Sequence, residues 1–521
     1  MTPYLPDDCI YDILEYLQDF RDFRSILFNC MLVNRFWCRT AIPLLYANPF
    51  ATCKKGIILT FTLCFSKEEI LQLKNQMNNN FMININDEYK PLFDYPKYLK
   101  IYNYSSINFT ILGWINSYKR KYKKFCSIFN QLILNHCINI DRFNIDLVKL
   151  DSFIEFNPEL NIPISNLTKL NSLTLELAKL QAFKHEIGKE FLNNIIIHCL
   201  NLKKLEIFEI TQPIVSRESL RTDTTEKICE LIRKQNNLEK FISSHYLTNN
   251  ILLSLKFQQH SLVSIEFSRI DFSNISFDNF IHLYNLNYLR FSNCFDMKQS
   301  KNDRYEILKS ASFKLKNLKF GFNNWNENIE PTIIKYSGSS LQKLSMYENS
   351  ITNSNIQNIS MYCLNLLTLE ISIFGNMNLI ETSFFKNLEN SKLRKLNIFI
   401  YNNTQNDPND THESLMKLAN NLSINIKEIS FWFTTYKPSF FIKIFLEKCH
   451  NYLEKISLEI KQMINVSVEE FLKAILNYIE KSNNSLKIFN IITTDRKRLN
   501  DEESRILDEI KVKGVKIVTN L

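Results

Sequence analysis

The chain has 521 residues, 45% of them hydrophobic and 22% charged, with 63 basic and 54 acidic side chains. This composition is typical of a folded protein and argues against extended disorder. The formal net charge of +9 permits an acidic partner but does not require one. Only 7 residues are glycine, so we expect asparagine to occupy many turns, as at Asn78–Asn80, Asn323–Asn324 and Asn402–Asn403.

Several classes of function lack their sequence signals. No Cys-x-x-Cys pair occurs among the 12 cysteines, which argues against a structural zinc site. The glycines form neither a phosphate-binding loop nor a nucleophile elbow. We therefore predict a protein that is not an enzyme and has no metal or cofactor. Because there is no signal-peptide profile and no apolar run of about 18 residues, we also predict a cytoplasmic or nuclear protein with reduced thiols and no membrane partner.

The densest basic run extends from Lys119 to Lys124. It has the composition of a nuclear-localisation or phosphate-binding patch, but a solvated helix face is the more common role of such a run. We favour the solvated face, and we expect no nucleic-acid partner.

The first 46 residues are patterned as a small helical module. Asp7 and Asp8 follow Leu5-Pro6 and suit the start of a helix, where acidic side chains meet unpaired amides. From there Ile10, Ile13, Leu14 and Leu17 recur at intervals of three and four, which predicts one apolar stripe on a helix. Two further apolar runs follow within the module.

The module resembles an F-box through Leu5-Pro6, the helix with Ile10, Ile13 and Leu17, then Cys30-x-x-Val33-Asn34-Arg35-x-Trp37 and Pro43-Leu44-Leu45-Tyr46. This resemblance implies docking on the Skp-family adaptor of an SCF ubiquitin ligase and, through it, on the cullin scaffold. It also implies an adaptor-binding stripe that partly packs internally and partly contacts the adaptor, formed by Leu5, Pro6, Ile10, Ile13, Leu14, Leu17, Leu27, Cys30, Val33 and Trp37. The alternative is a helical cap for the array that follows.

Residues 47–95 have the character of a connector. The run from Gly56 to Phe65 fits either a buried helix or a strand. Ser66 and Glu69 match a capping box at the start of a helix that continues through Leu73. We expect helices here that join the module firmly to the array, with loops at residues 75–86 and at Pro91.

From residue 96 onward one pattern recurs, apolar-x-x-apolar-x-apolar, with helical stripes between its copies. It has a mean spacing of about 30 residues and thirteen copies, which start at Phe129, Leu170, Leu202, Leu238, Leu262, Leu286, Leu315, Leu341, Leu366, Leu393, Ile426, Leu453 and Leu486. An earlier copy is indicated at Pro96, Leu99 and Ile101. A last helix through Ile506 and Ile510 and a strand at residues 515–518 are expected to cap the array.

The recurring pattern resembles leucine-rich repeats. We therefore predict an α/β fold, an N-terminal three-helix F-box-like module followed by a curved leucine-rich-repeat solenoid with parallel strands on the concave face and helices on the convex face. The predicted domains are 1–46 (module), 47–95 (connector) and 96–521 (solenoid with its cap). The family pattern also places a turn-forming Asn or Cys after the strand, at Cys137, Cys294, Asn323 and Asn349.

Three cysteines, Cys199, Cys363 and Cys449, lie just before predicted strands. In this they resemble the cysteine-containing subclass of leucine-rich repeats, which is often joined to F-boxes. A catalytic or redox role is the alternative, but cysteines on an apolar stripe at a helix end are usually small core residues. We predict that they pack in the core.

Side chains between the apolar strand positions should face the concave side, because successive residues of a strand point to opposite faces. The target-binding residues predicted on this basis are Lys203, Lys204, Glu206, Tyr288, Arg290, Lys343, Arg394 and Lys395, with Asn287, Gln342, Ser345 and Asn397 also facing solvent. The excess of lysine favours an acidic or phosphorylated target, although exposed lysine also keeps sheet edges soluble.

The resemblance implies a non-catalytic adaptor, the substrate-recognition subunit of an SCF ubiquitin ligase, with an unknown protein substrate held on the repeats. The alternative is a leucine-rich-repeat interaction scaffold with no link to ubiquitin.

Overall fold

The structure is a computed structural model that describes residues 6–17, 23–75, 91–115, 121–147, 163–178, 187–210, 218–296, 306–311, 314–347, 352–374, 388, 391–401, 415–433, 438–460, 468–493 and 499–519. The chain forms two compact units, Met1–Leu262 and Val263–Leu521. The boundary between them falls inside the predicted array, whereas the predicted divisions at residues 46 and 95 stay a prediction.

Unit 1 holds the three-helix module and the first repeats. Its strands are β1 (Ile101–Asn103), β2 (Arg142–Asp146), β3 (Ser172–Ala178), β4 (Lys204–Ile210) and β5 (Lys240–Ser244). Its α-helices are α1 (Asp7–Tyr16), α2 (Phe23–Met31), α3 (Arg35–Leu45), α4 (Gly56–Thr62), α5 (Lys67–Lys74), α6 (Tyr104–Ile115), α7 (Lys121–His136), α9 (Ile164–Leu167), α10 (Ile187–His198), α11 (Glu218–Lys234) and α12 (Asn249–Leu255). Short 3₁₀ helices are η2 (Pro49–Thr52), η3 (Tyr95–Tyr98) and η4 (Lys256–Gln258).

Unit 2 continues the same alternation of strand and helix. Its strands are β6 (Ser264–Ser268), β7 (Tyr288–Ser292), β8 (Asn317–Gly321), β9 (Lys343–Tyr347), β10 (Thr368–Phe374), β11 (Lys395–Tyr401), β12 (Glu428–Phe433), β13 (Lys455–Ile460), β14 (Ile488–Thr493) and β15 (Lys516–Thr519). Its helices are η5 (Phe277–Phe280), η6 (Ile307–Ser310), α14 (Ile329–Ser337), η7 (Gly338–Ser340), α15 (Asn353–Tyr362), α18 (Pro438–Lys448), α19 (Val468–Lys481) and α20 (Asp501–Val512).

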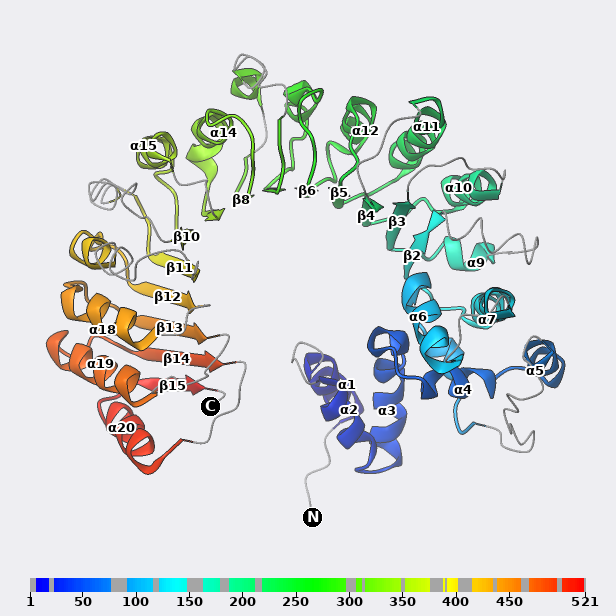
Figure 1. Ribbon diagram of the computed structural model, residues 1–521, viewed down its shortest axis with the longest axis horizontal. Helices are drawn as coiled ribbons and strands as arrows, with labels where there is room; N and C mark the ends of the chain where they lie inside the picture. Colours follow the sequence, from blue (N-terminus) through cyan, green and yellow to red (C-terminus); the bar gives the residue numbers. More distant parts are fainter. Residues whose placement is uncertain are drawn as a thin grey trace. The chain divides into compact units, whose positions relative to one another are not determined.

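Within each unit the strands lie side by side in chain order and every pair is parallel. Figure 1 shows the strands of each unit along its inner side and the helices along its outer side. The helices that the structure describes between consecutive strands therefore lie on the outer side, where the crossovers of a parallel sheet pass. The predicted α/β repeat solenoid is confirmed.

The repeated apolar positions form the core between strands and helices. In unit 1 the register aligns Leu173, Leu205 and Phe241, and none of them is exposed. In unit 2 Leu344 and Leu369 are aligned and buried in the same way. Each such side chain contributes about 1.5–3 kcal/mol by leaving water, and because each repeat buries its leucines only against its neighbours, the core lengthens without thickening.

Two further sets of hydrogen bonds join neighbouring repeats. The carbonyl of Asn171 accepts from both Lys203 N–H and Lys204 N–H, at 2.8 and 3.0 Å, and equivalent bonds recur before most strands. On the helix side the buried Gln235 donates to the carbonyl of Cys199 at 2.7 Å and accepts from Leu202 N–H at 2.9 Å. Backbone groups left over at the end of one repeat are thus satisfied by a side chain of the next.

Twelve of the thirteen predicted repeat starts, all except Phe129, precede an observed strand. Phe129 lies inside helix α7, so the prediction of a strand there is wrong. Phe125, Phe129 and Ile133 are buried at helical spacing, and the strand pattern fitted this stripe by coincidence. The strand of this repeat is β2, and Tyr102 of β1 pairs with its Phe143.

Several local predictions are confirmed. Ser66 and Glu69 form a capping box that begins α5, and residues 56–62, which fitted either structure, are helical. Asn323 accepts a hydrogen bond from the buried backbone N–H of Cys294 at 2.9 Å, as the turn pattern predicted. The terminal helix and strand are α20 and β15.

The predicted use of asparagine in turns is met only in part. Left-handed backbone occurs at Asn293, Asn483 and Asn484, but also at other residue types such as Arg269 and Phe322. Asn323–Asn324 are not among these positions. Asn78–Asn80, Asn349 and Asn402–Asn403 lie outside the described residues.

Candidate protein-binding surfaces

The three-helix module, α1 to α3, has an apolar core of its own. Ile10 and Leu14 from α1, Leu27 from α2, and Ala41 and Leu44 from α3 are buried against one another. Leu17, Cys30 and Trp37, which were predicted to bind the adaptor, are partly buried around this core. Ile10, Leu14 and Leu27 were predicted for the same stripe, and they lie in the interior, where they shape the module rather than its surface.

The turn into α3 is fixed by Asn34. Its backbone is extended, and its side chain accepts a hydrogen bond from Trp37 N–H at 3.0 Å. Asparagine is among the best residues for this role because it satisfies an amide that the helix leaves unpaired. The Val33-Asn34-Arg35-x-Trp37 string therefore sets where α3 starts and where Trp37 packs.

The surface of the module carries large apolar side chains. On α1 the exposed fractions are 41% for Tyr11, 40% for Ile13 and 66% for Tyr16. At the end of α2 Phe28 is 54% and Leu32 is 72% exposed, and the next residue, Val33, is 61% exposed. Phe28 and Leu32 are four residues apart and so lie on one face of the helical turn. Clustered exposed apolar side chains of this kind mark interaction sites.

The predicted adaptor-binding residues divide accordingly. Pro6, Ile13 and Val33 are exposed, whereas Leu5 lies outside the described residues. The sequence prediction did not include Tyr11, Tyr16, Phe28 and Leu32. They are apolar residues at positions outside the buried stripe of an amphipathic helix. An apolar residue at such a position is the sequence signal that could have identified them.

The module is joined to the first repeat by backbone and side-chain contacts. The carbonyl of Ala47 accepts from Lys100 N–H and Ile101 N–H, both at 3.0 Å, in the way that repeats are joined to one another. Arg24 of α2 donates to the carbonyl of Asn48, and burial lowers the pKa of its guanidinium. Tyr46 packs against the ring of Tyr95 at 4.3 Å between centroids.

On the inner side of unit 1, the three predicted target-binding residues lie in ion pairs. Lys204 contacts Glu206 at 2.8 Å, and Lys203 contacts Glu239 at 3.9 Å. These side chains remain partly exposed, so each pair contributes little to stability. This part of the surface presents charges of both signs.

The inner side of unit 2 carries a row of polar side chains across neighbouring strands. The parallel register aligns one residue from each strand, in the order Glu266, Arg290, Lys319, Ser345, Glu370 and Asn397. Arg290, a predicted target-binding residue, donates to Glu266 at 3.3 Å. We call these six residues the polar row.

Glu370 is the centre of the polar row. It is 5% exposed, and its Oε2 accepts from Ser345 Oγ at 2.6 Å and from Tyr347 Oη at 3.1 Å. Its Oε1 accepts from Asn397 Nδ2 at 2.9 Å and lies 2.7 Å from Lys343 Nζ. Burial raises the pKa of Glu370, but the hydrogen bonds and the charge of Lys343 outweigh burial and hold the pKa below its ordinary value.

These contacts correct one prediction. Ser345 and Asn397 were expected to face solvent, but they are only 2% and 5% exposed. Both lie on the predicted side of the sheet, and both are buried where they hydrogen-bond to Glu370. The carboxylate of Glu370 also binds the ammonium of Lys343, which is one of the predicted target-binding residues.

Aromatic side chains border the polar row. The ring of Tyr347 packs edge-on against Phe399 at 4.9 Å, and Phe399 against Trp432 at 3.8 Å between centroids. Lys319 Nζ lies 4.8 Å from the centroid of Tyr347. The sequence prediction included Tyr288, Arg290 and Lys343 but missed Lys319, Glu370 and this aromatic set. Arg394 is exposed and Lys395 half-buried, both at the start of β11.

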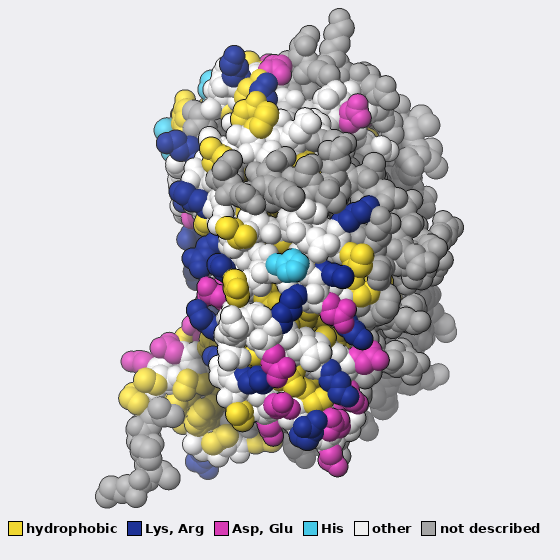
Figure 2. All heavy atoms as spheres, turned by 90° about the vertical axis from the view of Figure 1, so that its left-hand side faces the viewer, with side chains coloured by type: hydrophobic (Ala, Val, Ile, Leu, Met, Phe, Trp, Pro, Cys, Tyr) yellow, Lys and Arg dark blue, Asp and Glu magenta, His cyan; other side chains and the backbone are white. Residues whose placement is uncertain are grey.

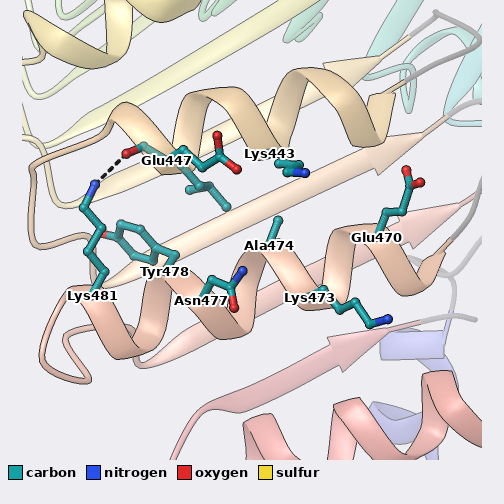
Figure 3. Close-up of a pocket in the computed structure, with 9 residues that line it drawn as sticks. Lys443, Glu447, Glu470, Lys473, Ala474, Asn477, Tyr478 and Lys481 are labelled. Atoms are coloured by element: carbon teal, nitrogen blue, oxygen red, sulfur yellow. Dashed lines mark hydrogen bonds between the residues drawn. The ribbon is translucent and has the colours of Figure 1, made fainter.

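On the helical side of unit 2 a groove with a volume of about 450 Å³ lies between α18 and α19. Figure 3 shows Lys443 and Glu447 on one helix facing Lys473, Asn477 and Lys481 on the other. Lys481 donates to the carbonyl of Glu447 at 2.6 Å, closing the end of α18. Figure 2 shows basic and acidic side chains interspersed over the lower part of this face.

The cysteines before the strands are core residues. Cys199, Cys363 and Cys449 are at most 1% exposed. Burial raises the pKa of the thiol to about 12 in Cys199 and Cys363 and to about 11 in Cys449. They are therefore protonated at neutral pH, which does not favour nucleophilic chemistry. The described part of the chain holds no group of three metal-ligating side chains, and no helix in it is long and apolar enough to cross a membrane.

Comparisons with known proteins identify no family. The chain matches no protein-family description and no curated protein sequence. One similar solved structure is the crystal structure of the Rad7 and Elc1 complex in yeast, at 13% sequence identity, over 71% of this chain and 86% of that chain, with a TM-score of 0.33. A TM-score this low establishes neither a common fold nor a common function.

Proposed function

We propose that the protein is the substrate-recognition subunit of an SCF ubiquitin ligase. In this proposal the three-helix module docks on a Skp-family adaptor, the adaptor joins it to the cullin scaffold, and the repeats hold a target protein. The observation that carries the proposal is the exposed apolar surface of a module that already has a complete core, on residues that resemble an F-box. Such a surface is costly in water unless a partner covers it.

The role proposed for the chain is to position its partners. The module would fix the chain on the ligase, and the inner side of the repeats would hold the target near the ubiquitin-carrying enzyme. Holding two reactants together converts an encounter between molecules into a step within one complex, which by itself raises the rate. No catalytic side chain of this protein enters the proposal.

Co-purification with a Skp-family adaptor tests the proposal. We expect the wild-type chain to retain the adaptor, and the Leu5→Ala/Pro6→Ala and Phe28→Asp/Leu32→Asp variants to lose it. The matched control is Ile424→Asp, which places the same charge at a 71% exposed apolar residue of unit 2 and should leave retention unchanged. Circular dichroism of each variant establishes that it is folded. Failure of the wild type to bind any Skp-family adaptor would end the proposal.

A free-standing interaction scaffold is the second candidate. The hydrogen bonds from Lys100 N–H and Ile101 N–H to the carbonyl of Ala47, just after the module, favour it, because an end cap on the first repeat would be held by such bonds. Under this alternative, deletion of residues 1–46 lowers the melting temperature of the rest of the chain, and no Skp-family adaptor co-purifies with any form. Adaptor capture by the full chain therefore decides between the two functions.

A further inference from the structure

The charges on the inner side of β6 to β10 do not balance. Three cations, Arg290, Lys319 and Lys343, share this surface with two carboxylates, Glu266 and Glu370. Glu266 pairs with Arg290 and Glu370 with Lys343, at 3.3 and 2.7 Å. Among the residues that the structure describes here, one positive charge is left without an ion pair, on Lys319.

Lys319 makes no ion pair with any residue that the structure describes. Its ammonium lies over the ring of Tyr347, a contact that attracts a cation but does not neutralise it. Burial lowers the pKa of Lys319, and the nearby charge of Arg290 lowers it further. The ammonium is thus partly stripped of water and held beside a second cation, the setting in which an added anion gains most.

Gly321 follows Lys319 on the same face of β8, and its neighbours in the register are Ser292 and Tyr347. Gly321 is buried, and a Cβ built there would contact Ser292 Oγ at 3.7 Å and the Tyr347 ring at 3.9 Å. The sheet is therefore covered at this residue, whereas Lys319 itself is half-buried and can be reached from solvent.

We propose that Lys319 binds the carboxylate of an aspartate or glutamate in an acidic segment of the target protein that lies across the inner side of β6 to β10. This deepens the proposed function by naming the chemistry of the target. A single unpaired positive charge matches the single charge of a carboxylate better than the double charge of a phosphate. A free small anion would make this one contact alone, so it would not be retained. A polypeptide adds contacts along the neighbouring strands.

Peptide selection with the full-length protein tests this. The probe is a random-sequence peptide library displayed on phage, followed by synthetic forms of one selected peptide that carry Glu, Gln or phosphoserine at the enriched position. We expect the wild type to enrich Asp and Glu, and to bind the Glu peptide about tenfold more tightly than the Gln peptide. Raising the salt concentration should weaken the Glu peptide only.

Two variants locate the site. Lys319→Met should remove the preference for Glu over Gln, whereas Lys316→Met, at an exposed lysine just before β8, should keep it. A library without acidic enrichment, tighter binding of the phosphoserine peptide than of the Glu peptide, or equal behaviour of Lys319→Met and Lys316→Met would each overturn the proposal.

The adaptor experiment separates this inference from the proposed function. Lys319→Met changes no residue of the three-helix module, so it should retain the Skp-family adaptor as the wild type does. Loss of acidic-peptide selection with intact adaptor capture would reject the carboxylate site alone. Peptide selection without adaptor capture would reject the ligase role alone.

Discussion

The three-helix module and the polar row of unit 2 present opposite chemistry to a partner. The core of the module is buried, and further apolar side chains such as Leu32 are exposed on its surface. A partner would bind this surface through apolar contacts. The polar row has most of its polar groups already bonded to one another around Glu370. The first arrangement suits one constant partner, and the second suits discrimination by charge, because an ill-matched ligand leaves buried polar groups unsatisfied.

The largest loss of stability should come from shortening a side chain in the core of the module. Leu14 has no exposed surface, and Leu14→Ala removes its apolar contacts and leaves a cavity, at a cost of about 3 kcal/mol to the module. Adaptor capture should fall because the module opens. The measurement is thermal unfolding of the full chain followed by circular dichroism, together with co-purification.

The control for this change is Tyr16→Ala on the same helix. Tyr16 is 66% exposed, so its removal should change stability by less than about 0.5 kcal/mol while still weakening adaptor capture. If Tyr16→Ala destabilised the module as much as Leu14→Ala, the separation into core and binding surface would be wrong.

A smaller effect is expected in the polar row. Glu370→Ala leaves Ser345, Tyr347 and Asn397 without their shared acceptor, and we expect a loss of about 2 kcal/mol in unit 2. The cost is limited because Lys343 is 46% exposed on its side chain and can return to water. Urea unfolding followed by tryptophan fluorescence measures it, since Trp432 lies two strands away.

The Glu370→Ala variant also tests the contrast between the three-helix module and the polar row. Glu370→Ala should leave adaptor capture unchanged, because the module lies in unit 1. Glu447→Ala, at an exposed glutamate of α18, is the matched control and should change stability by less than about 0.5 kcal/mol. Equal losses in the two variants would mean that the network around Glu370 adds nothing.

Much of the repeat array can be predicted from the sequence because the pattern that specifies each strand lies within a few consecutive residues. The pattern that starts at Leu341 contains both the apolar residues of its strand and the residues between them. The position of the strand and the side of the sheet that each residue faces can therefore be predicted together. The prediction of a strand at Phe129 was wrong because one short apolar pattern fits both a helix and a strand. Periodicity alone does not separate the two.

The candidate sites were harder to predict because they depend on register. Ser345 and Asn397 are 25 and 27 residues away from Glu370 in sequence, and only the alignment of β9, β10 and β11 brings the three together. The sequence prediction placed Ser345 and Asn397 on the inner side, but it did not name Glu370 or show that the three residues bond to one another. Likewise, Phe28 and Leu32 belong to apolar runs of the sequence, and only the packing of the helices around Leu27 shows that they are exposed.

Acid should weaken the polar row through Glu370, which gives the smallest of these effects. Its folded-state pKa lies below the ordinary value, so the carboxylate contributes stability above the unfolded pKa of about 4.3 and loses it as the pH falls through the lower folded value. The test is the melting temperature of wild type and Glu370→Gln from neutral to acid pH. The wild type should be more stable at neutral pH, and the difference should shrink with acid, because protonated Glu370 resembles glutamine. A difference that stayed constant over this range would show that the charge of Glu370 does not stabilise the row, and its hydrogen bonds alone would then account for the burial of Ser345 and Asn397.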